Sequence, residues 1–293
     1  MPSLKEVRVR IDSVKSTQQI TSAMKMVAAS KLRKAQNAIL KLRPYASKLN
    51  EILQNLSASL DNSEDGIYSE DRGIQKVLLI VIASNRGLCG AFNANVIKEA
   101  NRLIQDKYQS QFEVGNVSIY CVGKKVVDFY KNRDYKIAGN NIDIFDDLSF
   151  ENAVPIAEQF MNEFVEKKYD RIEFVYNQFK NAATQALINE QFLPIAKDEE
   201  AKAGDFSIDF IFEPGKQQIV EELIPKSLKI QFYKALLDSY ASEHGARMTS
   251  MHKATDNAEE LINDLQLKYN KARQAAITNE ILEIVSGAEA LKG

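Results

Sequence analysis

The sequence predicts an α/β domain inserted between two long helices that pair with each other as an antiparallel coiled coil. Near both ends of the chain, apolar residues recur in steps of three and four, and between them short β-branched runs alternate with helical segments. Steps that alternate in this way average about 3.5 residues, which keeps one narrow apolar seam facing a partner helix. Two such seams around a globular insert indicate that the two ends of the chain are partners.

The first helix is expected over residues 1–60, beginning at Ser3 or Leu4. Pro44 interrupts the pattern and should kink or loosen the helix, because proline lacks an N–H donor. At 1.5 Å per residue the helix would extend roughly 85 Å, more than a compact domain of this size needs. Its seam is formed by Leu32, Ala35, Ile39, Leu42, Ala46, Leu49, Leu53, Leu56 and Leu60.

The last helix is expected over residues 216–293, roughly 100 Å if it is uninterrupted to about Ser286. Gly245 marks an expected irregularity. The length of both helices indicates that reach is their purpose. The second seam is formed by Met248, Met251, Thr255, Ala258, Ile262, Leu265, Tyr269, Ala272 and Ala276.

The insert is expected over residues 76–195 as a small doubly wound, Rossmann-like sheet. Short β-branched runs bounded by turn residues are typical of buried strands, and their alternation with helices indicates parallel βαβ units. Residues 61–75 are expected to be a linker and 196–215 a loop that ends in an extended segment, Ile208–Phe212. Ala186–Ile195 is expected as an antiparallel edge strand, since Pro194 excludes a central position. The other expected elements are strands Lys76–Ala83, Val117–Val122 and Arg171–Tyr176, and helices Ala91–Tyr108, Lys124–Lys131 and Phe150–Lys167.

Composition bounds the class of protein. Apolar residues make up 45% of the chain and charged residues 27%, which is enough for a real core and excludes a disordered tail. No apolar run reaches 18 residues, so no membrane span or signal peptide is expected. The two cysteines, Cys89 and Cys121, argue against a disulfide scaffold. A reducing location that faces the cytoplasm is predicted.

The net charge of −2 hides a basic amino-terminal end. Residues 1–43 carry ten Lys or Arg side chains and only Glu6 and Asp12 as acids, a balance of about +8, so the remainder totals about −10. A basic helix favours an acidic partner, either nucleic acid or an acidic protein surface.

Ser84–Ala91 (SNRGLCGA) follows a predicted buried strand and precedes a predicted helix, which is where α/β proteins hold phosphates. The spacing matches neither of the two glycine-rich phosphate motifs, and no lysine follows the second glycine. A structural turn or a surface that touches a partner is therefore favoured over a nucleotide site.

No catalytic, cofactor or metal site is predicted. Cys89 has no histidine nearby in sequence, because His244 and His252 both lie on the last helix. These two histidines are eight residues apart, too far to share one metal ion. Asp146-Asp147 and Glu221-Glu222 are interpreted as surface charges.

Several blocks of sequence together resemble the gamma subunit of the F-type ATP synthase, in its bacterial form. The resemblance spans the chain and keeps the same order. Asn85 stands where this family often has Asp, and residues 61–74 and 196–207 match little. The blocks are Ser13–Lys31 (SVKSTQQITSAMKMVAASK), Gly87–Asn93 (GLCGAFN), Ser242–Met248 (SEHGARM), Ala254–Ala258 (ATDNA) and Ile277–Ala288 (ITNEILEIVSGA).

The resemblance implies the central rotor shaft of a rotary motor, which itself performs no covalent chemistry and binds no nucleotide. The implied partners are the catalytic and non-catalytic nucleotide-binding subunits of a hexamer, the epsilon subunit, and a ring of c subunits turned by ion flow; nucleic acid is not among them. The implied location is peripheral, on the cytoplasmic face of the bacterial inner (plasma) membrane. ATP synthesis and proton (or sodium) transport belong to the complex.

The resemblance also carries contact residues onto matching positions. Met24 and Lys25 fall where the shaft meets acidic lever loops of the catalytic subunits, and Arg247 lies in the matching block of the other helix. The segment held by a catch loop of a catalytic subunit contains Arg273, Gln274, Thr278 and Glu280.

Two alternatives remain open from the residues alone. One is a small-molecule α/β enzyme with coiled-coil dimerisation arms, in which residues 84–91 form a phosphate loop. The other is a coiled-coil nucleic-acid binder that uses the basic first helix, although basic and aromatic residues do not interleave there.

Overall fold

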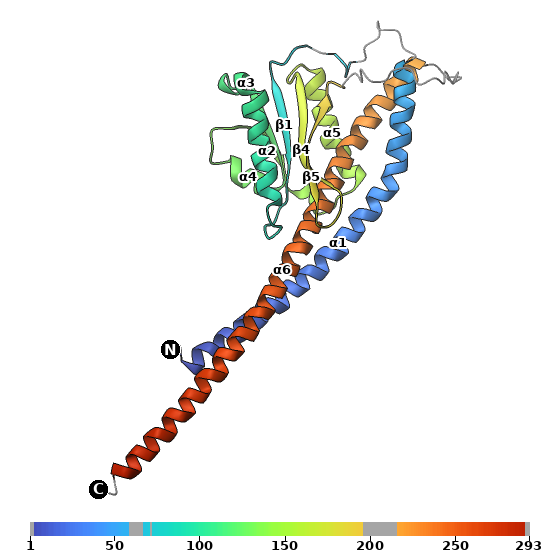
Figure 1. Cartoon of the computed structure of the whole chain (residues 1–293). Helices are drawn as coiled ribbons and strands as arrows, with labels where there is room; N and C mark the ends of the chain where they lie inside the picture. Colours follow the sequence, from blue (N-terminus) through green and yellow to red (C-terminus); the bar gives the residue numbers. More distant parts are fainter. Residues whose placement is uncertain (1–2, 59–66, 71, 196–215, 291–293) are drawn as a thin grey trace. The chain divides into compact units, whose positions relative to one another are not determined.

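The computed structural model describes residues 3–58, 67–70, 72–195 and 216–290 (Figure 1). The expectations for Leu60, for most of the 61–75 linker and for the 196–215 loop lie outside the described residues. The chain forms two compact units, Ala29–Arg247 and a second made of Met1–Ala28 with Met248–Gly293.

Two long helices contribute to both units. Helix α1 covers Leu4–Ala58 and helix α6 covers Lys216–Ala290, close to the predicted bounds. The helical conformation continues through Pro44 and through Gly245, so neither residue ends a helix. Gly245 instead permits a close approach, because a Cβ atom there would lie 3.2 Å from the carbonyl oxygen of Ala182.

The larger unit contains the predicted sheet. Its strands are β1 (Val77–Ile82), β2 (Val117–Val122), β3 (Lys136–Asn141), β4 (Arg171–Phe179) and β5 (Gln185–Leu193), in the order β3-β2-β1-β4-β5. Neighbours are parallel except for β4 and β5, which are antiparallel. The doubly wound sheet and its antiparallel edge strand are thus confirmed.

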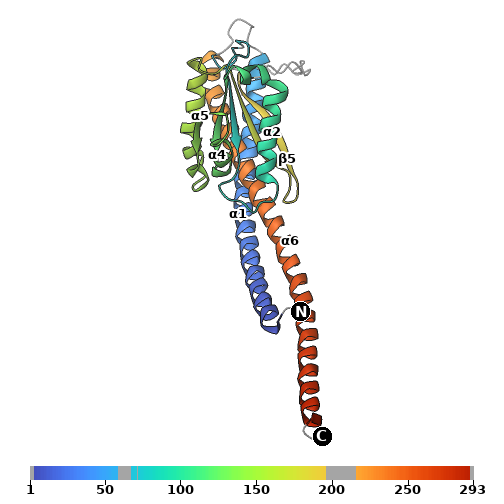
Figure 2. The same ribbon diagram turned by 90° about the vertical axis from the view of Figure 1, so that its left-hand side faces the viewer.

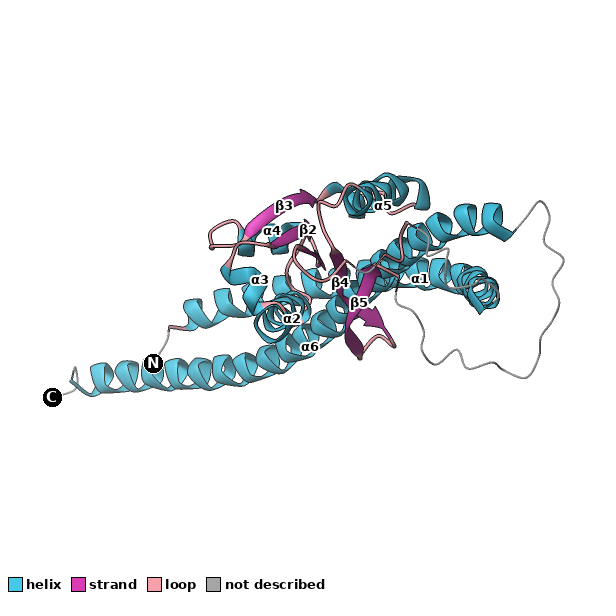
Figure 3. Cartoon of the chain, turned by 90° about the horizontal axis from the view of Figure 1, so that it is seen from above, coloured by secondary structure: helices cyan, strands magenta, loops and turns pink. Residues whose placement is uncertain are grey.

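Helices cover both faces of this sheet (Figure 3). The side chains of Val77, Leu79 and Val81 pack with α2 (Phe92–Lys107) and α4 (Lys124–Tyr130). The side chains of Leu78, Ile80 and Ile82, on the opposite face, pack with α5 (Phe150–Val165) and α6. Because both faces of β1 are buried, its sequence is a continuous apolar run rather than an alternating one.

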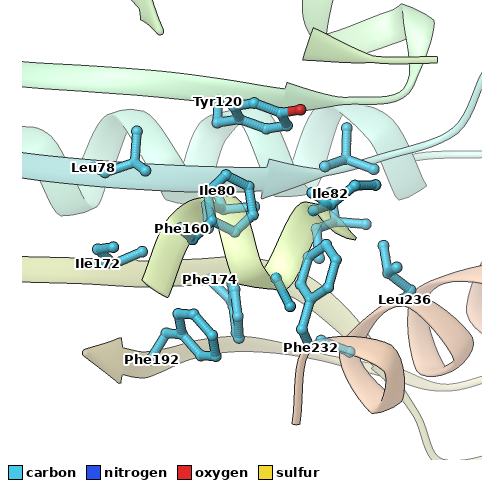
Figure 4. Packing of buried hydrophobic residues seen from close by; sticks show 14 of the residues in the cluster. Leu78, Ile80, Ile82, Tyr120, Phe160, Ile172, Phe174, Phe192, Phe232 and Leu236 are labelled. Carbon is cyan, nitrogen blue, oxygen red and sulfur yellow. The ribbon is translucent and has the colours of Figure 1, made fainter. Parts of the chain in front are cut away.

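Helix α6 is an integral part of the core of the sheet domain. Its Phe232 side chain is fully buried, and its ring centroid lies 5.7 Å from those of Phe160 and Phe174. Figure 4 shows this ring between the sheet, α5 and Leu236 of the same helix. The α6 residues in this cluster are Leu228, Phe232, Ala235 and Leu236.

Strand β3, the short helix α3 (Gln109–Glu113) and the 3-10 turn η1 (Asp143–Phe145) were not predicted. The β3 sequence, KIAGNN, has no apolar run, because the strand lies at the edge and most of its side chains are exposed. Gly139 within it packs against the ring of Tyr120, where a Cβ atom would come within 2.8 Å. Its pairing with β2 depends on this long-range contact.

The two long helices are antiparallel partners within each unit. In the smaller unit, Val7 and Ile11 pack with Leu265, and the hydroxyl groups of Thr21 and Thr255 are 2.9 Å apart. Contacts farther along α1 are thus made with earlier residues of α6, as in an antiparallel pair. In the larger unit, α1 runs beside α6 (Figure 2), and the Lys226 ammonium lies 5.8 Å from the Tyr45 ring centroid. The predicted coiled-coil pairing is confirmed.

Replacing Phe232 with alanine should lower the free energy of unfolding of the larger unit by about 3–5 kcal/mol, because it removes a fully buried ring and leaves a cavity. Chemical denaturation followed by circular dichroism measures the effect. Leu267→Ala is the matched control on the same helix, since Leu267 is 62% exposed and its truncation should cost less than about 0.5 kcal/mol. Equal effects of the two substitutions would show that α6 does not belong to the core.

Candidate functional site

The carboxyl ends of β1 and β4 form the place where a doubly wound sheet usually binds a ligand. The chain builds β2 and β3 on one side of β1 and then returns to add β4 on the other side, so the order reverses between β1 and β4. Ligands of such folds occupy the crevice outside this switch point. Residues 84–91, singled out from the sequence, lie at the end of β1.

The 84–91 loop is held by its own side chains and by α2. Ser84 donates its hydroxyl hydrogen to the carbonyl oxygen of Arg86 (2.6 Å) or to Oδ1 of Asn93 (2.9 Å), and its backbone N–H donates to the same Oδ1 atom (3.0 Å). Leu88 at the tip is 64% exposed and has a left-handed backbone with a φ of 62°. The loop is therefore a fixed turn that presents an apolar side chain.

Helix α6 occupies the switch-point crevice from the other side. The Ser242 hydroxyl donates to the carbonyl oxygen of Asn177 at the end of β4 (3.0 Å). The Arg247 guanidinium donates to the carbonyl oxygens of Arg86 and Gly87, at 3.2 and 3.3 Å. The crevice that would receive a ligand is filled by the chain's own helix.

Arg247 is also bonded within its own helix. Its Nη1 atom donates to Oε1 of Glu243 at 2.6 Å, and both residues are less than a tenth exposed. Burial raises the pKa of the Glu243 carboxyl, and the Arg247 charge opposes that rise. Both charges of this ion pair are withdrawn from water, so removal of one would leave the other buried without a partner.

His244 lies beside this ion pair as a neutral imidazole. Burial, together with the positive charges of Arg247 and Lys31, lowers the pKa of His244 to about 3. Its Nδ1 atom accepts from Nη1 of Arg247 at 3.3 Å, and its Nε2 atom has no hydrogen-bond partner in the described part of the chain. The Tyr240 ring packs edge-on against it, with centroids 4.4 Å apart.

Asn85, a departure from the resembled sequence motif, forms two hydrogen bonds with its side-chain amide. Its Oδ1 atom accepts from the backbone N–H of Lys124 (2.9 Å), at the start of α4, while its Nδ2 atom donates to the carbonyl oxygen of Ile142 (2.7 Å). An aspartate could make the first bond but not the second, since an ionised carboxylate has no donor. In this chain one amide joins three segments of the carboxyl edge.

The loop does not present a phosphate cradle. A cradle needs backbone N–H groups that point at the ligand. Here the carbonyl oxygens of Arg86 and Gly87 are turned to the crevice and bound by Arg247. Cys89 is buried, and burial raises the pKa of its thiol, so it is not an activated nucleophile. The geometry favours the structural-turn interpretation over the nucleotide-binding enzyme.

No group of three or more His, Cys, Asp and Glu side chains suited to a metal ion occurs among the described residues. None of the described helices is both long and apolar enough to cross a membrane.

The contact residues carried over from the resemblance fall in different environments. Met24 and Lys25 are half-buried on α1, next to a shallow groove in the smaller unit. Arg247 is 7% exposed and is bound inside the larger unit. The groove is lined by Gln18, Gln19, Ser22, Ala23, Met26 and Thr255, and the exposed set on α6 is Arg273, Gln274, Thr278 and Glu280.

Comparison with known proteins decides the family. A family model described as ATP synthase matches residues 3–291. The ATP synthase gamma chain of Christiangramia forsetii is 59% identical over 295 residues and covers 100% of both chains. That of Flavobacterium johnsoniae is 58% identical over 297 residues, again covering 100% of both. The chain belongs to the ATP synthase gamma chain family.

Solved structures share the fold of this gamma-chain family. A chain from the Euglena gracilis mitochondrial ATP synthase, in a structure titled OSCP/F1/c-ring, aligns with a TM-score of 0.64 at 22% identity and covers 98% of this chain and 94% of that one. A rotor structure from the same organism aligns with a TM-score of 0.60 at 21% identity, covering 94% and 98%. At these identities the likeness concerns the fold alone.

Sequence reasoning missed the role of Arg247 in binding the 84–91 loop. The guanidinium and its two acceptors are 160 and 161 residues apart in the chain. The gamma-chain resemblance marked both segments as matching blocks, but nothing in the sequence indicated that they touch. A signal was available in residues 228–247, which are apolar on more than one face, since such a helix is typically buried.

Acid should destabilise the larger unit through His244. The unfolded imidazole gains a proton below about pH 6.5, whereas the folded one, with its lowered pKa, does not, so stability is present above that pH and falls below it. His244→Gln removes this group. The free energy of unfolding of the unmodified chain should fall relative to His244→Gln by about 1.4 kcal/mol per pH unit, or about 2 kcal/mol near pH 5.

Denaturant unfolding at a series of pH values measures this difference. His252→Gln is the matched control, the same substitution at a histidine of the same helix whose side chain is 60% exposed. A profile of His244→Gln that runs parallel to that of the unmodified chain would show that the pKa of the buried imidazole is not lowered.

Proposed function

We propose that this chain is the central rotor shaft of an F-type ATP synthase. It couples the ion-driven rotation of a membrane-embedded c-ring to the conformational cycling of catalytic subunits that synthesise or hydrolyse ATP. The chain is a gamma chain, a subunit that is not itself catalytic. The observation that carries the proposal is the exposed stretch of α6 from Arg273 to Ala290.

This stretch follows the part of α6 that pairs with α1 in the smaller unit. The α1 helix begins at Leu4, and its first buried residues pack against Leu265 and Tyr269. From Arg273 to Ala290 every residue of α6 is exposed. Five large apolar side chains in this stretch are between 48% and 69% exposed: Ile277, Ile281, Leu282, Ile284 and Val285. Apolar surface of this extent is typical of a partner-binding site.

The antiparallel pairing supports a shaft. Two helices joined along an apolar seam resist bending and twisting more than one helix does, and rotation must pass along them to the catalytic subunits. On α1 the predicted seam residues Leu32, Ala35 and Ile39 are buried, whereas on α6 the predicted seam residue Ala276 is exposed. Met24 and Lys25, half-buried beside the shallow groove, and the exposed cations of α1 are suited to acidic lever loops.

We assign the partners by the same reasoning. The exposed end of α6 and the α1 face around Met24 contact the nucleotide-binding subunits of the hexamer. The sheet domain, with the epsilon subunit, contacts the c-ring. The complex lies on the cytoplasmic face of the bacterial inner membrane, and this chain is attached to the membrane only through the complex.

Reconstitution tests the proposal. A nucleotide-binding hexamer that lacks its gamma chain should regain ATP hydrolysis and, when joined to the membrane sector in vesicles, ATP-driven proton uptake after addition of this chain. The isolated chain should show no ATPase activity and no heat of binding with Mg-ATP. Hydrolysis by the chain alone, or a hexamer that gains nothing from it, contradicts the proposal.

Gln274→Leu should lower both ATP hydrolysis and proton uptake of the complex at least fivefold. The exposed Gln274 amide would be buried against a catalytic subunit, and leucine would leave the partner's polar group there unpaired. Gln266→Leu is the control, being the same change at another exposed position on α6. Steady-state rates of complexes with equal gamma-chain content give the comparison. Indistinguishable rates for the two variants would rule out a contact at Gln274.

A further inference from the structure

Three neighbouring buried residues lie at the end of the part of α6 that belongs to the larger unit. Ser242, Gly245 and Arg247, here called the α6 clamp, contact three separate parts of the sheet domain. These parts are the end of β4, the turn between β4 and β5, and the 84–91 loop. Arg247 is also the last residue of the unit.

We propose that the α6 clamp is a torque junction, which keeps the sheet domain from turning relative to the shaft helix under load. This inference rests on the proposed rotor function and extends it by naming the residues through which rotation passes. Arg247 acts as a positioning residue, through the loop that it binds.

The position of the clamp supports this role. The apolar contacts of α6 with the sheet, from Leu228 to Leu236, lie earlier in the helix. The clamp comes about two to three turns later, at the exit of the helix from the unit. A constraint at the exit opposes the twisting of a shaft more directly than one farther back. Because the three contacts lie on different segments, they fix the orientation of the helix as well as its distance.

The chemistry of the contacts supports it as well. Apolar packing is non-directional, so it holds a helix against a sheet but resists rotation about the helix axis only through shape. Hydrogen bonds weaken steeply when their angles change. The planar Arg247 guanidinium donates to Arg86 and Gly87 from Nη2 and to Glu243 from Nη1. Turning the helix would break these bonds together.

Stability alone does not account for the buried polar groups around Arg247. A buried ion pair is often no more stabilising than apolar residues of the same volume, because both charges must be desolvated. Glu243 and Arg247 are 6% and 7% exposed, and His244 beside them leaves Nε2 without a partner in the described residues. The burial of these charges is better explained by the orientation in which they hold the Arg247 guanidinium.

A reversible staple tests the proposal. A Cβ atom at position 245 would lie 3.3 Å from the Cα atom of Ala182, so the pair Ala182→Cys and Gly245→Cys is within the span of a disulfide. The native Cys89 and Cys121 are buried and stay in place. The staple is combined with Arg247→Met in the whole complex in vesicles, and proton uptake per ATP hydrolysed is measured.

Arg247→Met alone should lower the proton uptake per ATP at least fivefold. The oxidised staple should restore it to within twofold of the unmodified complex, and a reducing agent should abolish that recovery. The matched control carries the two cysteines and keeps Arg247. Its proton uptake per ATP should be the same when the staple is oxidised and when it is reduced. If the oxidised staple restores nothing, or if Arg247→Met leaves the ratio unchanged, the torque junction is wrong.

A second measurement uses no cysteine substitutions, so it does not depend on assembly of the double-cysteine variant. Arg247→Met should speed hydrogen exchange at the amides of residues 85–90 at least tenfold in the assembled complex and leave β1 unchanged. Arg247→Lys should be intermediate in exchange and in coupling, since lysine keeps the charge but not the planar fork. Loss of coupling without faster exchange in the loop would contradict the junction and show that Arg247 acts through a contact with a partner subunit. A failure of the unmodified complex to pump protons would contradict the proposed function rather than the junction.

Discussion

The packing of α6 against the sheet is the interaction on which the rest of the structure depends. Phe232 and its neighbours complete one face of a sheet that would otherwise expose the apolar side chains of β1 and β4. The same helix then continues into the smaller unit, where it pairs with the start of α1. One element is therefore both a layer of the sheet domain and one half of a helix pair.

This arrangement also explains why a doubly wound fold serves here without a ligand site of the usual kind. The switch point between β1 and β4 is present, and a glycine-containing loop follows β1 as in nucleotide-binding relatives of the fold. The crevice, however, receives Ser242 and Arg247, and the loop turns its carbonyl oxygens toward the guanidinium. A position that other proteins use for binding is used here for attachment.

Much of the fold could be predicted from the sequence because its strongest signals are local. The apolar run VLLIVI has to be a strand buried on both faces, and Leu32, Ala35 and Ile39 repeat with the period of a coiled-coil seam. Strand β3 could not be predicted, since its place depends on Gly139 fitting against Tyr120 rather than on any pattern of its own. The attachment of Arg247 was hidden for the same reason, as its acceptors lie on another block of the chain. The contact residues Met24, Lys25, Gln274 and their neighbours came from resemblance, and their roles stay predictions.

The central claim is that the sheet domain and residues 228–247 of α6 form one cooperative unit. Hydrogen exchange of the full-length chain under native conditions tests it most directly, because segments that unfold together share one free energy of opening. The account predicts that the amides of β1, β4 and α6 from Leu228 to Leu236 exchange with the same opening free energy. It also predicts that they lose protection together when Phe232 is truncated. Helix amides that exchange far faster than the strands would contradict it, since α6 would then only lie on the domain rather than complete it.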